Sequence, residues 1–278
     1  MAAELAAQDG ARLTAGQIVE RIQKNVGVAW RTETVDKIVA GTAQTPVRGI
    51  ATTMMSTFDV LQRAVAKGRN FIITHEPTFY NHLDTTDQFS SDPTYLAKAD
   101  FICKHEIAVF RFHDHWHAMR PDGIATGMIQ ELGWEKNVDP QNPRQLRFSG
   151  IPLAKFAQEM QKKLGARTIR VIGDPNLAVK TARAGWGYAG NPPGMAALSS
   201  QDVDVYICGE TREWELIPYA QDVIATGKKK GIIVLGHVAS EQGGMKYCAA
   251  WLKAFVTEVP VDFVPVAEPF WSPDKPVA

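Results

Sequence analysis

A short apolar strand that runs directly into a histidine and a glutamate is the feature that most restricts this fold. The residues Phe71–Thr74 read Phe-Ile-Ile-Thr, and His75, Glu76 and Pro77 follow at once. An unbroken apolar run of this length is typical of a strand that is buried on both faces, as in the parallel sheets of α/β proteins. Such sheets place their ligands at the carboxyl ends of their strands. The segment alone fits a water-facing strand end equally well, since a metal or catalytic site needs several converging groups.

Two later apolar strands end in the same way. Residues 107–112 lead into His113-Asp114-His115-Trp116-His117, which holds three of the chain's seven histidines. Residues 232–236 lead into His237, and Glu241 follows four positions later, so both side chains can lie on one face of a helix or tight turn. A solvated histidine tract would lie outside secondary structure, whereas these histidines stand at strand ends. The pattern therefore favours metal ligands over solvent-exposed side chains that bind nothing.

The three strand ends predict one metal site. In a mostly parallel sheet the carboxyl ends of the strands point the same way, so residues distant in sequence can converge there. Imidazole and carboxylate groups without thiolate suit Zn, Mn, Fe or Ni. The same inventory argues against a closed, cysteine-rich structural zinc site.

The order of the expected elements predicts an α/β chain with two lobes. The segment 137–144 is rich in proline and asparagine and is interpreted as the connection between them. The N-terminal lobe, 1–136, would carry His75, Glu76, His113 and His117. The C-terminal lobe would be 137–278, with 232–278 returning to complete the metal site. The last long helix is expected over about 242–255.

The glycine-containing run 185–190 matches no phosphate-binding loop, because it has no Gly-Lys-Ser/Thr and no helix start at the required place. It is interpreted as a tight turn, with 191–194 as further loop, and no nucleotide-binding residues are assigned.

Charge and cysteine content exclude several classes of protein. Thirty basic residues balance thirty acidic ones, which argues against binding to nucleic acid or to an anionic membrane. The three cysteines are too few and too widely spaced for a disulfide framework, and buried thiols are expected. No apolar run is long enough to span a membrane, and no export signal opens the chain, although a trimmed signal is compatible with the sequence. A cytoplasmic location is expected.

The chain resembles the Nif-three-like family, also called GTP cyclohydrolase I type 2 homologues. The resemblance covers nearly the whole chain. Its most specific marker is Gly236-His237-x3-Glu241 after an apolar strand. The other markers are the helix 17–26, the strand with His75-Glu76-Pro77, His113-x3-His117 with the helix end at Leu132-Gly133, and Gly209-Glu210.

The resemblance implies a two-lobed, mixed-sheet α/β subunit of a toroidal hexamer, with a dinuclear metal centre at the carboxyl ends of strands. Carried over by position, the metal ligands would be His75, Glu76, His117, His237 and Glu241. Glu210, His113 and His115 are candidates for an outer-shell or catalytic role.

Two positions depart from the family pattern. The family usually has His-His-Pro where this chain has His75-Glu76-Pro77, and an aspartate where this chain has His117. The exchange keeps three histidines and two carboxylates but moves one carboxylate. We expect Glu241 to bridge two metals, and we hypothesise that Glu76 takes over the second bridge. One or two divalent ions are compatible with this set, and Zn, Fe, Mn and Ni are not distinguished.

The function is open between three classes. The first is a metal-dependent hydrolase of a small molecule, with a nucleotide or heterocycle as candidates and GTP suggested by the family name only. The second is a non-catalytic metal-binding ring that acts as a scaffold or interaction protein. The third, a nucleic-acid-binding ring, is disfavoured by the neutral charge.

Overall fold

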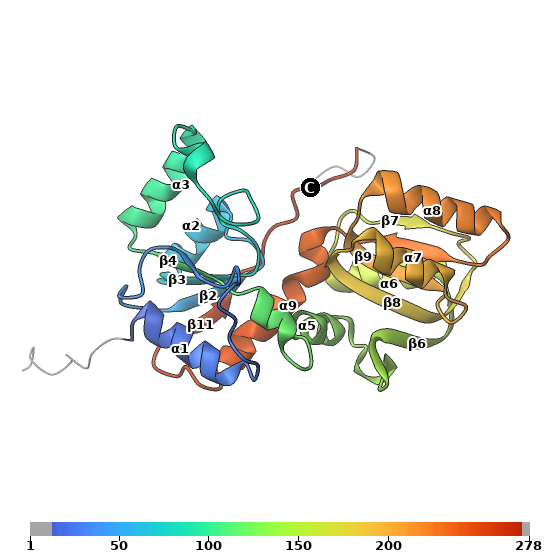
Figure 1. Ribbon diagram of the computed structural model, residues 1–278, viewed down its shortest axis with the longest axis horizontal. Helices are drawn as coiled ribbons and strands as arrows, with labels where there is room; N and C mark the ends of the chain where they lie inside the picture. The colour runs from blue at the N-terminus through green and yellow to red at the C-terminus, as the bar shows by residue number, and fades with distance from the viewer. Residues whose placement is uncertain (1–12, 274–278) are drawn as a thin grey trace, which may run out of the picture. The chain divides into compact units, whose positions relative to one another are not determined.

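The computed structural model describes residues 13–273, which form two compact units (Figure 1). Among the described residues, one unit contains 13–123 and Met245–Val266, and the other contains Ile124–Gly244 and 267–273. The first break therefore falls after Gly123, whereas the sequence suggested the connection 137–144. Each unit has its own mixed sheet and is treated separately below.

The first unit is built on a five-stranded sheet in the order β1-β4-β3-β2-β11. The strands β4, β3, β2 and β11 are parallel, and only β1 is antiparallel to its neighbour β4. Thr74 and Arg111 are partners in the register of β3 and β4, so these two strands end level with each other. The strands are β1 (Ile38–Ala40), β2 (Ile50–Thr53), β3 (Phe71–Thr74), β4 (Ala108–Arg111) and β11 (Val261–Phe263).

Capping residues mark where two helices of this unit begin. Thr14 and Gln17 form a capping box at the start of α1, and the Asp92 carboxylate accepts from the Tyr95 N–H to cap α3. The short helix α4 follows β4 at once. The helices are α1 (Ala15–Asn25), α2 (Phe58–Ala66), the 3-10 turn η1 (Asp87–Phe89), α3 (Pro93–Lys104) and α4 (Asp114–Ala118).

The second unit is built on a six-stranded sheet in the order β5-β6-β8-β9-β10-β7. The strands β8, β9 and β10 are parallel, and the outer pairs are antiparallel. Its strands are β5 (Val138–Asp139), β6 (Asn142–Pro152), β7 (Arg170–Ile172), β8 (Ala178–Tyr188), β9 (Val205–Glu210) and β10 (Gly231–Val234). The helices that follow or precede them are α5 (Gly123–Leu132), η2 (Glu135–Asn137), α6 (Leu153–Leu164), α7 (Asn191–Ser199), α8 (Glu213–Ala225) and α9 (His237–Leu252).

Four expectations about this region are corrected. The segment 137–144 forms η2, β5 and the start of β6, and 185–190 is mostly the end of β8, paired with β9. The prolines after Asn191 lie in the first turn of α7, where a missing N–H costs nothing, so that segment is helix and not loop. The helix α9 begins at His237 itself, five residues before the expected start.

The amino-terminal half of α9 is held against α5 by glycines. A Cβ built on Gly127 would clash with the backbone of Gly243 and Gly244, and one built on Gly244 would clash with Ile124. Backbone therefore packs on backbone here, which fixes the helix that carries His237 and Glu241.

No helix of residues 13–273 is both long and apolar enough to cross a membrane.

Candidate metal centre

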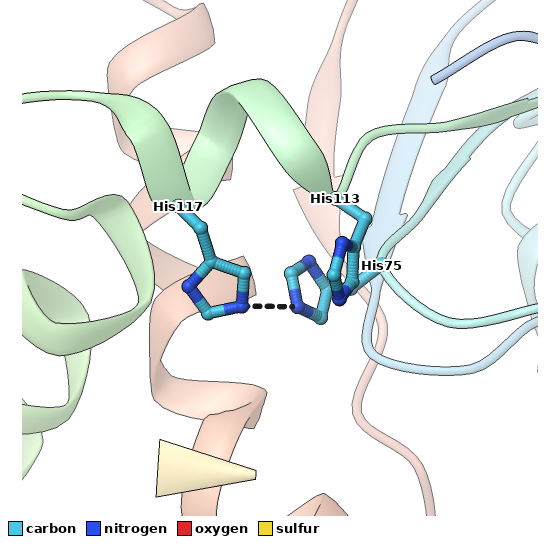
Figure 2. Close-up of side chains that lie close together, drawn as sticks. All are labelled: His75, His113 and His117. Carbon is cyan, nitrogen blue, oxygen red and sulfur yellow. Dashed lines mark hydrogen bonds between the residues drawn. The ribbon is translucent and has the colours of Figure 1, made fainter. Parts of the chain in front are cut away.

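His75, His113 and His117 gather at the carboxyl ends of β3 and β4 (Figure 2). His75 follows β3, while His113 precedes α4 and His117 lies within it. A ligand-competent atom from each residue lies within 4.8 Å of the others. The level ends of two parallel neighbouring strands bring these residues together, as the sequence predicted for this pair of strands.

The ring nitrogens of His75 and His117 are oriented by the protein. His75 Nδ1 lies 3.1 Å from the carbonyl oxygen of Phe112, which only accepts, and His117 Nδ1 lies 3.0 Å from Asp122 Oδ2. Both Nδ1 atoms therefore carry the proton in the neutral rings. The two Nε2 atoms, each with a lone pair, face each other at 3.2 Å. Two histidine nitrogens on one tetrahedral ion, each about 2.0–2.1 Å from it, would be about 3.3 Å apart.

His113 belongs to the same cluster, although sequence reasoning gave it only an outer-shell or catalytic role. Its ring stacks on that of His75 with a centroid distance of 4.5 Å. Its Nδ1 lies 2.9 Å from Asp114 Oδ1. Burial raises the pKa of Asp114, but hydrogen bonds from His113, Thr34 and the Val35 N–H outweigh it and lower that pKa to about 2. Asp114 is thus an anion that holds the His113 ring.

The Glu76 carboxylate lies next to the cluster and also forms an ion pair with Arg111. Its Oε1 lies 3.9 Å from His113 Nε2, and its Oε2 accepts from Arg111 Nη2 at 3.3 Å.

His115 lies outside this cluster. Its side chain is fully buried, its Nδ1 lies 2.7 Å from Asp36 Oδ2, and its Nε2 accepts from the Arg31 N–H at 3.0 Å. The ring also stacks on Trp30 with a centroid distance of 3.7 Å. Both ring nitrogens are therefore used in holding the fold.

Asp36 fixes the start of α4. Its two carboxylate oxygens accept from the backbone N–H groups of His113, Asp114 and His115 as well as from the His115 ring. On the other side of the helix, the fully buried Trp116 packs on Phe112 and Trp251. A five-residue helix has little stability of its own, so these contacts determine where His113 and His117 lie.

The second unit carries its own group of candidate ligands, at the ends of β9 and β10. His237 Nδ1 lies 3.0 Å from Glu210 Oε1, and its Nε2 lies 3.1 Å from Glu241 Oε2. Both ring nitrogens of His237 therefore face carboxylate oxygens, so in the neutral ring one of them directs its lone pair at an acceptor. The Glu241 side chain is 3% exposed and that of Glu210 is 53% exposed.

Gly187 in β8 makes room for the Glu241 carboxylate. A Cβ on Gly187 would clash with Glu241 Oε1, and its φ of +69° also favours glycine. The adjacent Ser240 hydroxyl accepts from the Gly187 N–H at 3.0 Å. The glycine-containing run at 185–190 is therefore part of the second unit's ligand group.

The expectation that the three strand ends belong to one sheet needs correction. The strands before His75 and His113 are neighbours in the first unit's sheet, but β10 belongs to the six-stranded sheet. Each unit holds ligand-competent groups at the ends of its own parallel strands. The sequence missed Asp122, Asp36 and Gly187. An acidic residue five positions after His117 was the available signal for Asp122, whereas nothing local marks Asp36.

The cysteines take no part in either group. Cys208 and Cys248 are buried free thiols, and burial raises the pKa of Cys208 to about 12. Cys103 is exposed, which corrects the expectation that all three are buried.

These features define an α/β protein with mixed sheets and histidine-carboxylate groups of the kind that bind divalent metals. Residues 15–269 match the family model of Duf34/NIF3 (NGG1p interacting factor 3), and the chain belongs to that family. This confirms the resemblance drawn from the Gly-His-x3-Glu element and its companions.

Individual relatives are distant in sequence. The chain is 22% identical over 215 residues to the GTP cyclohydrolase 1 type 2 homolog of Clostridium acetobutylicum, covering 73% of this chain and 76% of that one. A hypothetical protein of Staphylococcus aureus has a similar structure, with a TM-score of 0.70, 14% identity, and coverage of 94% of this chain and 99% of that one. A Bacillus cereus protein related to NIF3 gives a TM-score of 0.69 at 16% identity, with coverage of 92% and 98%. These likenesses establish the fold.

Proposed function

We propose that this protein binds divalent metal ions, one or two per chain. The candidate ligands are His75, Glu76 and His117 in the first unit and His237 and Glu241 in the second. His113, whose ring lies in the first unit's cluster, is an additional candidate ligand. The donor set of imidazole and carboxylate fits Zn, Fe, Mn or Ni.

One observation carries this proposal. In the first unit two acceptor atoms face each other at hydrogen-bond distance, His75 Nε2 with His117 Nε2 at 3.2 Å. In the second unit His237 lies between two carboxylates, at 3.0 and 3.1 Å, so one nitrogen of the neutral ring faces an acceptor. Two lone pairs at this separation repel each other unless a cation is shared between them. Each of these three histidines donates its other nitrogen to an acceptor, which is the outer-shell arrangement usual for metal-binding imidazoles.

We further propose that the reaction is hydrolysis of a small molecule. A divalent ion held here would polarise the bond to be cleaved and lower the pKa of the attacking water. Glu210 orients His237, and its half-exposed carboxylate can exchange a proton with solvent, which suits an outer-shell or proton-transfer role. The name of the Clostridium relative suggests GTP or a related nucleotide or heterocycle as substrate. The sequence contains no Gly-Lys-Ser/Thr phosphate loop in support of GTP.

A non-catalytic metal-binding ring is the second candidate. Burial of the ligand groups favours it, because the His75 side chain is fully buried and that of Glu241 nearly so. A structural metal has no coordination position open to a substrate, whereas a catalytic metal keeps one. A homo-hexameric toroid and a cytoplasmic location belong to either version of the proposal, and the three free thiols are in keeping with a reducing compartment.

The test combines metal analysis with an activity screen. Purified protein is analysed for bound metal, then screened against nucleotides and heterocyclic amides with His237→Ala as the inactive control. We expect metal-dependent hydrolysis that is lost in the variant. Equal activity of wild type and variant on every substrate would remove the catalytic proposal while leaving metal binding to be judged from the elemental analysis.

A further inference from the structure

Arg111 is a fully buried cation directly behind the first unit's histidine cluster. It is the last residue of β4, and its side chain is 1% exposed. Its Nε donates to the His75 carbonyl oxygen at 3.3 Å, and its Nη2 donates to Glu76 Oε2 at 3.3 Å. Its Nη1 donates to the His82 carbonyl oxygen and lies 3.8 Å from Asp84 Oδ2. One guanidinium thus holds both candidate ligands at the end of β3 and the loop that follows them.

The two oxygens of the Glu76 carboxylate have different neighbours. Oε2 is engaged by the guanidinium, while Oε1 lies toward His113 Nε2 at 3.9 Å. The other nearby anion, Asp84, uses its Oδ1 to accept from the Thr78 and Phe79 N–H groups at 2.7 and 2.8 Å. Asp84 is held to the loop through Oδ1, while its Oδ2 lies 3.8 Å from Arg111 Nη1. Glu76 is the carboxylate that offsets Arg111 on the side of the cluster.

We propose that Arg111 is a positioning residue that restricts Glu76 to one donor oxygen. This inference rests on the proposed metal centre. A carboxylate that bridges two ions through both oxygens gives one oxygen to each, and the positive guanidinium beside Oε2 opposes a second cation at that oxygen. Glu76 is then a one-oxygen ligand, in place of the second bridge that the exchange with His117 suggested.

The same contact explains why a carboxylate suits position 76. A buried guanidinium next to a bound cation is unfavourable unless an anion lies between them. An imidazole at position 76 would leave Arg111 with Asp84 at 3.8 Å as its nearest carboxylate. The Glu76–Arg111 pair therefore accounts for half of the exchange by which this chain departs from its family.

A double-mutant cycle in cobalt binding tests the proposal. Wild type, Arg111→Met, Glu76→Gln and the double variant are stripped of metal and titrated with Co²⁺, with affinity measured against a competing chelator and coordination followed by the visible absorption spectrum. We expect Arg111→Met to weaken binding about tenfold or more and to change the spectrum when Glu76 is present. In the Glu76→Gln background the same substitution should change affinity less than about twofold, because the group that Arg111 positions is already altered.

Two further variants keep this result interpretable. Arg111→Lys retains the charge without the planar fork, and we expect it to weaken binding several-fold, again only when Glu76 is present. Arg69→Met, which removes the Arg69–Asp262 ion pair of 2.6 Å in the same unit, should lower stability without changing cobalt affinity.

Equal effects of Arg111→Met in both backgrounds, no effect, or tighter binding would overturn the role of Arg111, and if that variant does not fold the same criteria apply to Arg111→Lys. A wild-type protein that takes up no cobalt would overturn the proposed metal centre and the inference together.

Discussion

Each candidate histidine has at least one ring nitrogen held by the protein, and the partners of the two nitrogens separate ligand-competent residues from structural ones. His75, His117 and His237 use Nδ1 for an acceptor and direct Nε2 at another candidate ligand atom. His115 uses both nitrogens within the fold. His115 and His117, two positions apart in α4, therefore differ in role.

Asp122 is expected to support metal binding through His117. The change Asp122→Ala removes the acceptor 3.0 Å from His117 Nδ1, so the ring loses its preferred tautomer and orientation. We expect a metal affinity about 10- to 100-fold lower, as is usual when an outer-shell carboxylate is lost. Competition with a chelator measures the affinity. Asp139→Ala, which breaks the pair between Asp139 and Arg147 in the second unit, is the control, and equal losses in the two variants would contradict this role.

Substitutions at His113 and His115 should have opposite consequences. His115→Gln leaves buried Asp36 without a ring partner and should lower the free energy of unfolding by about 1–3 kcal/mol, with metal affinity retained in the folded protein. His113→Gln removes a ring from the cluster and should lower metal affinity with a smaller loss of stability. Urea unfolding of the metal-free variants and titration of the folded ones separate the two effects. The reverse assignment of losses would refute the structural role given to His115.

At the scale of elements, short segments are placed by partners far away in sequence. The helix α4 is held by Asp36 and Trp116, the amino-terminal half of α9 by the glycines of its crossing with α5, and the Glu241 carboxylate by the space at Gly187. Each of these contacts positions a candidate ligand without touching a metal.

Gly187→Ala should weaken metal binding by displacing Glu241. The new Cβ would clash with Glu241 Oε1. Gly227→Ala is the matched control, because Gly227 also has a positive φ, +86°, but has nothing within 4 Å of its Cβ position. Each change should cost about 1 kcal/mol of stability from the backbone conformation. Only Gly187→Ala should also reduce metal affinity, and equal affinities in the two variants would contradict the placement of Glu241.

The loop after Glu76 should show a pH-dependent stability that comes from Lys98 of α3. Lys98 Nζ donates to the Thr78 carbonyl oxygen at 2.6 Å, and burial lowers its pKa from 10.5 to about 8, with Asp84 acting in the opposite direction. The unfolded chain therefore binds more protons than the folded chain between pH 8 and 10.5, so this residue makes stability rise with pH across that window.

Across this window Lys98 raises the free energy of unfolding by about 3 kcal/mol. Below pH 8 the ammonium group is charged in the folded protein, and the full cost of burying that charge lowers stability. Urea unfolding of wild type and Lys98→Met across this window isolates the contribution. The variant should lack this part of the rise, and identical pH profiles would show that burial of the ammonium group carries no such cost.

At the scale of the whole molecule, the sequence predicted what depends on local pattern. The apolar strands and the family marker around His237 are both local signals, and the fold class and the family are confirmed by the structure and the comparisons. The meeting of the ends of β3 and β4 was also expected from pattern, because the carboxyl ends of parallel strands lie on one edge of a sheet.

What the sequence did not predict depends on contacts between distant segments. Asp36 lies 78 residues before Asp114, the first residue of α4. Gly187 is also distant in sequence from Glu241, and it lies in a run whose glycines fit a turn as well as a strand. The sheet to which β10 belongs could not be inferred from an apolar run alone, because such a run fits any buried parallel strand. Likewise, the use of Glu76 Oε2 by Arg111 is visible only once β3 and β4 are paired.

The most direct test of the central claim is the metal content of the protein after equilibrium dialysis, measured by elemental analysis for wild type, His75→Ala, His117→Ala and His115→Gln. We expect one or two divalent ions per wild-type chain, a clear loss in His75→Ala and His117→Ala, and wild-type content in His115→Gln. A wild-type chain without bound metal, or an undiminished content when His75 and His117 are removed, would contradict that claim.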